Sequence, residues 1–94
     1  MAPPLFARFY INGQILYEKV KEIAKNQNYE IIYEDPVNKI LHIHKRVYGR
    51  TIHLIIHIGD GKDRSLAIDV KPGYEGFSMD YGRRFLEEIK KVAR

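Results

Sequence analysis

All four histidines of this chain lie in the stretch ILHIHKRVYGRTIHLIIHI, at positions 42, 44, 53 and 57. Neutral imidazole binds divalent metal ions, and its charge changes between about pH 5 and pH 8. The positions of the histidines in each pair, 42 and 44 or 53 and 57, differ by an even number, so each pair shares one face of a strand. This pattern predicts a metal site, a proton-sensitive surface or the solvated side of a sheet.

Hydrophobic periodicity predicts the elements that position these side chains. A first helix begins after Asn12, a favourable capping residue, and ends near Gln27 or Asn28. Its apolar residues share one face: Leu16, Tyr17, Val20, Ile23 and Ala24. Ser78 or Asp80 is expected to cap a second helix. The residues that this helix should bury are Tyr81, Phe85, Leu86, Ile89, Val92 and Ala93.

Between the two helices we expect four strands, in NYEIIYE, KILHIHKR, TIHLIIHI and RSLAIDVK. The turns between them are DPVNK, VYGR and GDGKD. The fold class is therefore α+β, a four-stranded antiparallel meander with both helices on one face. Residues 5–11, LFARFYI, form either an extra strand or a segment laid over the core.

Strand parity predicts that the histidines point away from the helices. If Tyr48-Gly49 is a two-residue turn, position 44 faces 53 and position 41 faces 56, so the aliphatic faces align. If the DPVNK and GDGKD turns each have an odd loop length, the core also contains Tyr29, Ile31 and Tyr33 of the first strand and Leu66, Ile68 and Val70 of the fourth. The expected outer row is Glu30, His44, His53 and Asp69.

The same parity places aliphatic side chains between the histidines. The expected interaction face consists of Ile32, Ile40, His42, His44, His53, Ile55, His57 and Ala67. A half-apolar sheet face without a covering layer indicates contact with a partner or a second copy.

Two other uses of these residues stay open. A divalent metal ion could be bound by His44 and His53 with Glu30 or Asp69, although strands about 4.8 Å apart allow only two or three of the four to converge. A nucleic-acid- or ribosome-associated protein would use the cations Lys45, Arg46, Arg50 and Arg83. The expected pattern places no strand aromatics on the outer face, which disfavours base stacking.

Composition limits the remaining classes. A chain of 94 residues suits a single domain, and the absence of cysteine excludes disulfides and thiolate chemistry. The net charge of +4 is mildly basic. No apolar run approaches the roughly 20 residues of a membrane span, and the first residues do not resemble a signal peptide, so we expect a cytoplasmic protein. Abundant Lys, Ile, Tyr and Glu suit a thermophile.

Three short pieces, YEIIYEDPVNKI, VYGR and GFSMDYGRRF, occur in order in this chain. Their order and spacing resemble a bacterial domain-of-unknown-function family, number fourteen ninety-nine. The similarity covers residues 14–94 and implies the fold, but no activity. KPGYE stands where that family has R-S-x-S-R, and GFSMDYG has one residue more than the family's G-x-S-D-x-G, so no arginine role is carried over.

These observations together predict a non-enzymatic interaction domain without a cofactor. It would bind a protein partner or form a homodimer through the outer face of its sheet.

Overall fold

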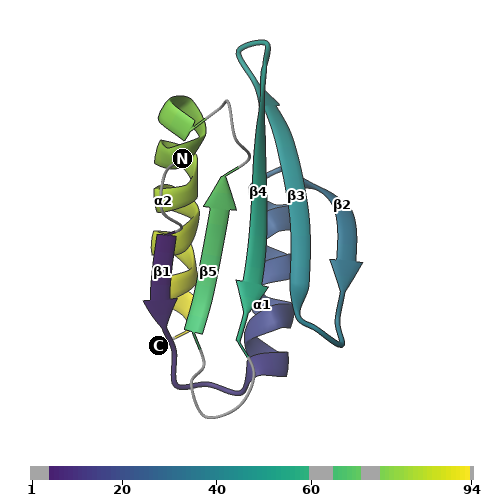
Figure 1. Ribbon diagram of the computed structural model, residues 1–94, viewed down its shortest axis with the longest axis vertical. Helices are drawn as coiled ribbons and strands as arrows, with labels where there is room; N and C mark the ends of the chain where they lie inside the picture. The colour runs from purple at the N-terminus through teal and green to yellow at the C-terminus, as the bar shows by residue number, and fades with distance from the viewer. Residues whose placement is uncertain (1–4, 60–64, 71–74, 94) are drawn as a thin grey trace.

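The structure, a computed structural model, describes residues 5–59, 65–70 and 75–93 as a five-stranded antiparallel sheet with two helices. The α+β class and the antiparallel sheet are therefore confirmed. In chain order the elements are β1 (Leu5–Arg8), α1 (Gly13–Asn26), β2 (Glu30–Asp35), β3 (Ile40–Val47), β4 (Arg50–Ile58), β5 (Ser65–Val70) and α2 (Glu75–Val92) (Figure 1).

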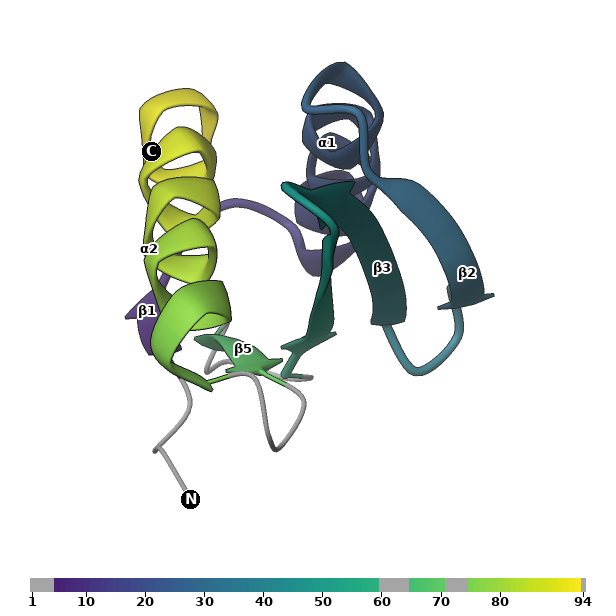
Figure 2. The same ribbon diagram turned by 90° about the horizontal axis from the view of Figure 1, so that it is seen from above.

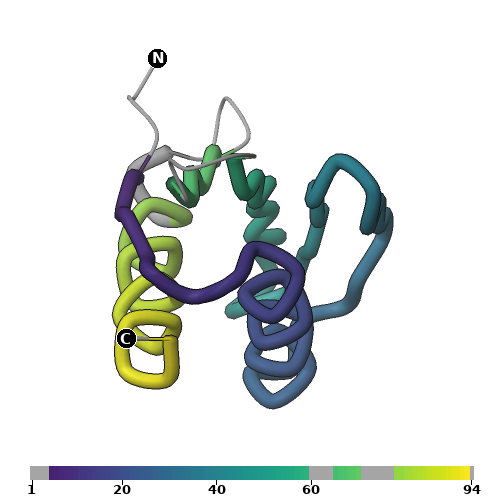
Figure 3. The backbone as a smooth tube through the Cα atoms, turned by 90° about the horizontal axis from the view of Figure 1, so that it is seen from below, coloured from purple at the N-terminus to yellow at the C-terminus, as the bar shows by residue number. Residues whose placement is uncertain are grey.

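The N-terminal segment is an extra strand at the edge of the sheet. β1 pairs antiparallel with β5, so the strand order is β1-β5-β4-β3-β2. The chain then runs from β1 past the ends of the two helices into α1 (Figure 3). Phe9 is buried in this connection. Five strands instead of four make β4 the central strand, with two strands on either side.

Both helices lie on the same side of the sheet (Figure 2). Helix α1 begins where Asn12 accepts hydrogen bonds from the backbone N–H groups of Gln14 and Ile15, at 2.8 and 3.3 Å. All five residues expected to be buried in α1 are buried. In α2 the buried residues include Phe85, Leu86, Ile89 and Ala93.

Three details of α2 differ from the sequence-based expectation. The helix begins at Glu75, before either predicted cap, and the Ser78 side chain is fully buried inside it. Tyr81 is only partly buried at the border of the core, and Val92 is half exposed. The Tyr81 ring lies beside the Lys45 ammonium group and the Arg84 guanidinium group, and Val92 is the last residue of α2.

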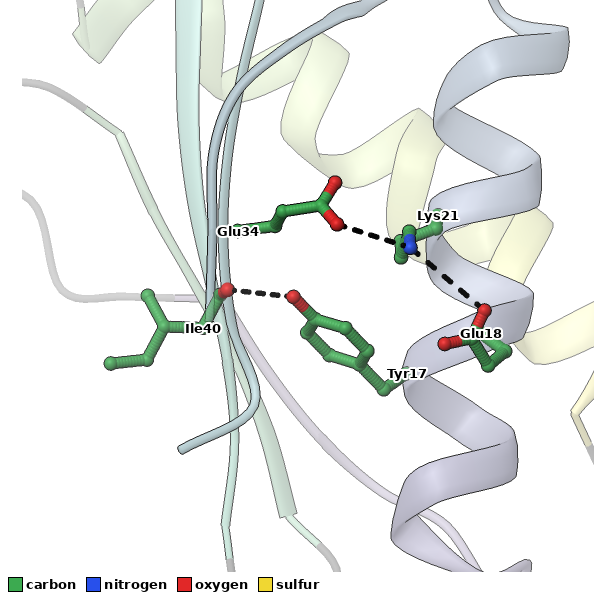
Figure 4. A network of polar contacts seen from close by, with 5 residues as sticks. All are labelled: Tyr17, Glu18, Lys21, Glu34 and Ile40. Atoms are coloured by element: carbon green, nitrogen blue, oxygen red, sulfur yellow. Dashed lines mark hydrogen bonds and ion pairs between the residues drawn. The ribbon is translucent and has the colours of Figure 1, made fainter. Parts of the chain in front are cut away.

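A β-bulge in β2 reverses the expected orientation of Tyr33. Ile31 pairs with Ile43, but Tyr33 pairs with His42, so Ile32 is the extra residue of the bulge. Tyr33 therefore lies on the histidine side and is half exposed, not in the core. Glu34 points toward α1 and lies 3.3 Å from the Lys21 ammonium group (Figure 4).

The same end of the sheet is joined to α1 by a second polar contact. The Tyr17 hydroxyl donates a hydrogen bond of 3.0 Å to the carbonyl oxygen of Ile40 (Figure 4). Lys21 is also 3.9 Å from Glu18 in the same helix. These contacts fix α1 against the hairpin that carries two of the histidines.

The β3–β4 hairpin has the predicted two-residue turn. Tyr48 and Gly49 both have positive φ, 53° and 77°, as a type I′ turn requires. The register pairs Leu41 with Ile56 and His44 with His53, as predicted. The GDGKD turn, with the Asp60-Gly61 pair, lies outside the described residues.

In the part of the chain that the structure describes, no helix is long and apolar enough to cross a membrane.

Candidate functional site

The surface of the sheet that faces away from both helices is the candidate site, and we call it the outer face. Three rows of residues that pair across neighbouring strands make up the outer face. The rows are Phe6–Ala67–His57–Ile40, Asp69–Ile55–His42–Tyr33 and His53–His44–Glu30. The residues that alternate with them on β3, β4 and β5, such as Leu41, Leu54 and Ile68, are fully buried beneath the helices.

The predicted row of two histidines and two carboxylates is correct for three of its four residues. Glu30 pairs with His44, and His44 pairs with His53. Asp69, however, pairs with Ile55 in the neighbouring row. The register of β5 is shifted by two residues from the expected one, which keeps each side chain on its face but changes its neighbours.

The histidine rings form a continuous cluster with one tyrosine. The ring centroids of His42 and His53 are 6.2 Å apart, and those of His44 and His53 are 6.3 Å apart. On the other side of His42, the Tyr33 ring lies at 5.1 Å. The His44 Nε2 atom is 3.3 Å from the Glu30 carboxylate. The cluster therefore runs across β2, β3 and β4.

Aliphatic and aromatic side chains complete the outer face. Ile40, Ile55 and Ala67 are half-buried among the histidines, and Ile32 in the bulge is 43% exposed. At the two edges of the sheet lie Phe6, 59% exposed, and Tyr33, 50% exposed. Covering such a surface with another one is favourable, because it removes apolar area from water.

Phe6 and Tyr33 are absent from the interaction face predicted from the sequence. The alternation in LFAR could have placed Phe6 outward once the segment was known to be a strand. No local signal marks the bulge that turns Tyr33 outward.

The residues considered for a metal ion do not converge as a set. His44 contacts Glu30 and pairs with His53 on β4. Asp69 instead pairs with Ile55, in the neighbouring row. Among the described residues, no group of three or more His, Cys, Asp or Glu side chains is arranged to hold a metal ion.

The four cations considered for nucleic-acid binding lie on different surfaces. Lys45 points to the helix side, opposite Ile52, whereas Arg46 and Thr51 are on the outer side next to His44. Arg50 pairs with Val47 at the end of the hairpin. By strand alternation, Arg50 belongs to the side of the sheet that faces the helices. Arg83 is on α2, 3.2 Å from Asp80.

The Lys45 side chain is used in packing. Its ammonium group lies 4.6 Å from the Tyr29 ring centroid and 5.5 Å from that of Tyr81, and it donates to the carbonyl oxygen of Gln27 at 3.0 Å. Burial lowers the pKa of Lys45. An open hollow of about 440 Å³ beside it is lined by Asn28, Glu30, His44, Lys45, Arg46 and Thr51.

Comparison with known proteins adds no relative: the chain matches no model of a protein family and no curated protein. The resemblance to family fourteen ninety-nine stays a prediction from short motifs.

Proposed function

We propose that this protein is a non-enzymatic interaction domain that associates with a second copy of itself through the outer face. The observation that supports the proposal most directly is the composition of this face. Aliphatic side chains lie in its middle, exposed aromatic rings lie at both edges, and both helices lie on the opposite side. Burying apolar area contributes roughly 25 cal/mol per Å², which makes this face the favourable one to cover.

The charges of the outer face favour a protein surface over a polyanion as the partner. Glu30 and Asp69 lie in its rows and Arg46 lies beside them. Nucleic-acid sites concentrate cations that neutralise phosphates, and mixed signs on one face do not supply them. Matched charges of both signs suit a self-complementary interface, in which the same patch is used twice.

Ile55 is the residue to change, because it lies in the middle row of the central strand. An interface that covers the outer face would bury Ile55, and Ile55→Lys would bury an ammonium group without a partner. The side chain is half-buried in the single chain, so a lysine can extend into solvent and the fold should persist.

The measurement is the molar mass by sedimentation as a function of concentration. We expect the unmodified chain to form a dimer and Ile55→Lys to weaken it at least about tenfold, since one lost contact of about 1.4 kcal/mol suffices. Val37→Lys is the matched control, because Val37 is 81% exposed in the turn after β2 and the change adds the same charge.

Three results would contradict the proposal: a monomer at the highest attainable concentration, equal dimerisation of Ile55→Lys, or equal weakening in Val37→Lys. Retention on RNA at low salt by a strictly monomeric chain would favour the nucleic-acid alternative instead.

A further inference from the structure

We propose that the tip of the β3–β4 hairpin binds single-stranded nucleic acid, with the Tyr48 ring stacked on a base and Arg46 in contact with a phosphate. This inference goes beyond the association proposed for the outer face and does not depend on it. Three observations support it. The hairpin projects beyond its neighbours, it carries positive charge without carboxylates, and its turn holds an exposed tyrosine in a strained conformation.

The hairpin projects from the sheet as an arm, which we define as residues 45–52. Residues 45–47 pair with residues 50–52, whereas the pairing of β2 with β3 stops at His44 and that of β5 with β4 stops at Leu54. The arm therefore extends about 10 Å beyond the described neighbouring strands, at about 3.3 Å per residue. Figure 1 shows its tip standing clear of the other elements. A flexible chain can approach such a ribbon from either side.

The arm is positively charged. It contains Lys45, Arg46 and Arg50, and no acidic residue occurs between Asp35 and Asp60 in the sequence. This composition distinguishes the arm from the rows of the outer face, which contain charges of both signs. A concentration of cations without carboxylates between them attracts the phosphates of a nucleic acid.

The three cations of the arm have different roles. The Lys45 ammonium group lies 4.6 Å from the Tyr29 ring centroid, and Arg50 also interacts within the chain. These two side chains contribute positive potential. Arg46 is exposed on the outer side of the arm, opposite Thr51. The direct phosphate contact therefore falls to Arg46, whose guanidinium group can bind two phosphate oxygens at once.

The turn at the end of the arm carries an aromatic side chain at its surface. Tyr48 is 92% exposed and has a φ of 53°. A bulky residue is disfavoured at positive φ, where Asn or Gly is the usual residue. Backbone strain of this kind is concentrated at binding and active sites. An exposed ring at the end of a cationic arm is suited to stack on an unpaired base, since every base has a face for stacking.

The outer side of the arm offers a place for the nucleotide next to the stacked base. The open hollow of about 440 Å³ beside Arg46 is within the size range of small-ligand sites. Its lining includes the Asn28 amide and the Thr51 hydroxyl, which donate and accept hydrogen bonds. Glu30, 3.3 Å from His44, repels a second phosphate and accepts hydrogen bonds from the edge of a base.

A membrane with anionic lipids is the other negatively charged surface that a basic arm could meet. Segments that bind such a surface bury several apolar side chains among the headgroups. The arm presents the single exposed ring of Tyr48, whereas Val47 beside it packs against the core. These side chains favour a nucleic acid as the partner.

The experiment measures binding of the unmodified chain to a fluorescent single-stranded oligothymidine of about 20 nucleotides by fluorescence anisotropy. At about 50 mM salt we expect a dissociation constant below about 100 µM, which rises as salt is added. A duplex of the same length should bind more weakly, because its bases are already stacked on one another. Absence of binding to the oligothymidine at this salt would overturn the proposal.

The Tyr48 ring is tested by two substitutions. Tyr48→Asn removes the ring and places in the turn a residue that tolerates positive φ, so the fold should persist. The dissociation constant should rise at least about fivefold, as expected for the loss of one stacked base. Tyr48→Phe keeps the ring and should bind as the unmodified chain does. Tyr10→Asn is the matched control, because Tyr10 is 83% exposed in the connection between β1 and α1.

The Arg46 contact is tested by the dependence of binding on salt. In Arg46→Gln the slope of the logarithm of the dissociation constant against the logarithm of the salt concentration should fall by about 0.7, the value for one phosphate of a single strand. Lys91→Gln removes the same charge from the last turn of α2 and should leave the slope unchanged.

Each further result bears on one contact. Equal or tighter binding of the duplex, or an unchanged affinity in Tyr48→Asn, would overturn the stacking. An unchanged slope in Arg46→Gln, or an equal decrease in Lys91→Gln, would overturn the phosphate contact. Binding to vesicles of phosphatidylcholine and phosphatidylserine, without binding to the oligothymidine, would assign the arm to a membrane surface instead.

Discussion

Lys45 and Tyr29 show how the environment of a residue decides its role. From the sequence Lys45 is one of four surface cations, but its strand position directs it to the helix side. There it lies over the rings of Tyr29 and Tyr81, a cation–π arrangement that holds the end of α1 against β3. Burial raises the pKa of the Tyr29 hydroxyl to about 12, and the nearby Tyr81 contributes to the rise.

Tyr29 predicts a loss of stability in alkali. In the unfolded chain this phenol ionises near its ordinary pKa of 10.0, and in the folded chain near about 12. The protonated Tyr29 phenol contributes its full stabilisation below pH 10. This contribution is lost as the pH rises toward 12, and the total loss in the free energy of unfolding is about 2–3 kcal/mol. Urea unfolding of Tyr29→Phe should show a smaller decrease over this range than the unmodified chain.

The matched control for this experiment is Tyr48→Phe, since Tyr48 is 92% exposed. Its alkaline decrease should equal that of the unmodified chain. An unchanged alkaline decrease in Tyr29→Phe would show that this hydroxyl does not contribute. Burial lowers the pKa of Lys45, the opposite direction to the shift of Tyr29. The contribution of Lys45 to the free energy of unfolding therefore increases with pH just below 10.5, so it cannot account for a loss of stability in alkali.

At the scale of elements, the β3–β4 hairpin positions the candidate site. Its type I′ turn sets the register, and the register places His44 opposite His53 and His42 opposite Ile55. The turn demands positive φ at both central residues, yet one of them is Tyr48. A bulky residue is disfavoured in this conformation, so the hairpin retains local strain.

Substitutions in the turn should change stability in opposite directions. Tyr48→Asn should stabilise the chain by about 0.5–1 kcal/mol, because Asn tolerates positive φ and the exposed tyrosine ring packs little. Gly49→Ala should destabilise it by about 1–2 kcal/mol, since φ is 77° and no atom lies near enough for a methyl group to gain contacts. Thermal unfolding of both variants measures the difference. A stabilised Gly49→Ala would contradict the assigned turn.

At the scale of the molecule, β1 completes both the sheet and the core. It covers the edge of β5, and its Leu5 packs so closely on α2 that a Cβ atom at Gly82 would lie 2.9 Å from the Leu5 Cδ1 atom. Glycine at position 82 allows helix and strand to approach at this point. β1 also brings Phe6 to the edge of the outer face.

Removal of residues 1–8 should therefore destabilise the whole chain. The loss of the partly buried Leu5 and Ala7 predicts a decrease of about 2 kcal/mol or more in the free energy of unfolding. The freed edge of β5 should promote aggregation, which light scattering would detect. Phe6→Ser keeps the strand and should stay within about 0.5 kcal/mol of the unmodified chain. Equal stability of the truncated chain would show that β1 is dispensable.

The sequence by itself determined the features that follow from local geometry. The period of a helix predicted the five buried residues of α1, and the alternation of a strand predicted that all four histidines share the face opposite the helices. A two-residue turn was enough to pair His44 with His53. These features depend only on the bond geometry of neighbouring residues.

The tertiary structure decided what depends on distant partners. The bulge at Ile32 turned Tyr33 outward, the register of β5 moved Asp69 beside Ile55, and pairing with β5 made residues 5–8 a strand. A bulge or a two-residue shift preserves the local pattern of apolar and polar residues, so the sequence pattern cannot distinguish the alternatives. Packing between strands selects one of them, because only one register fills the space beneath both helices.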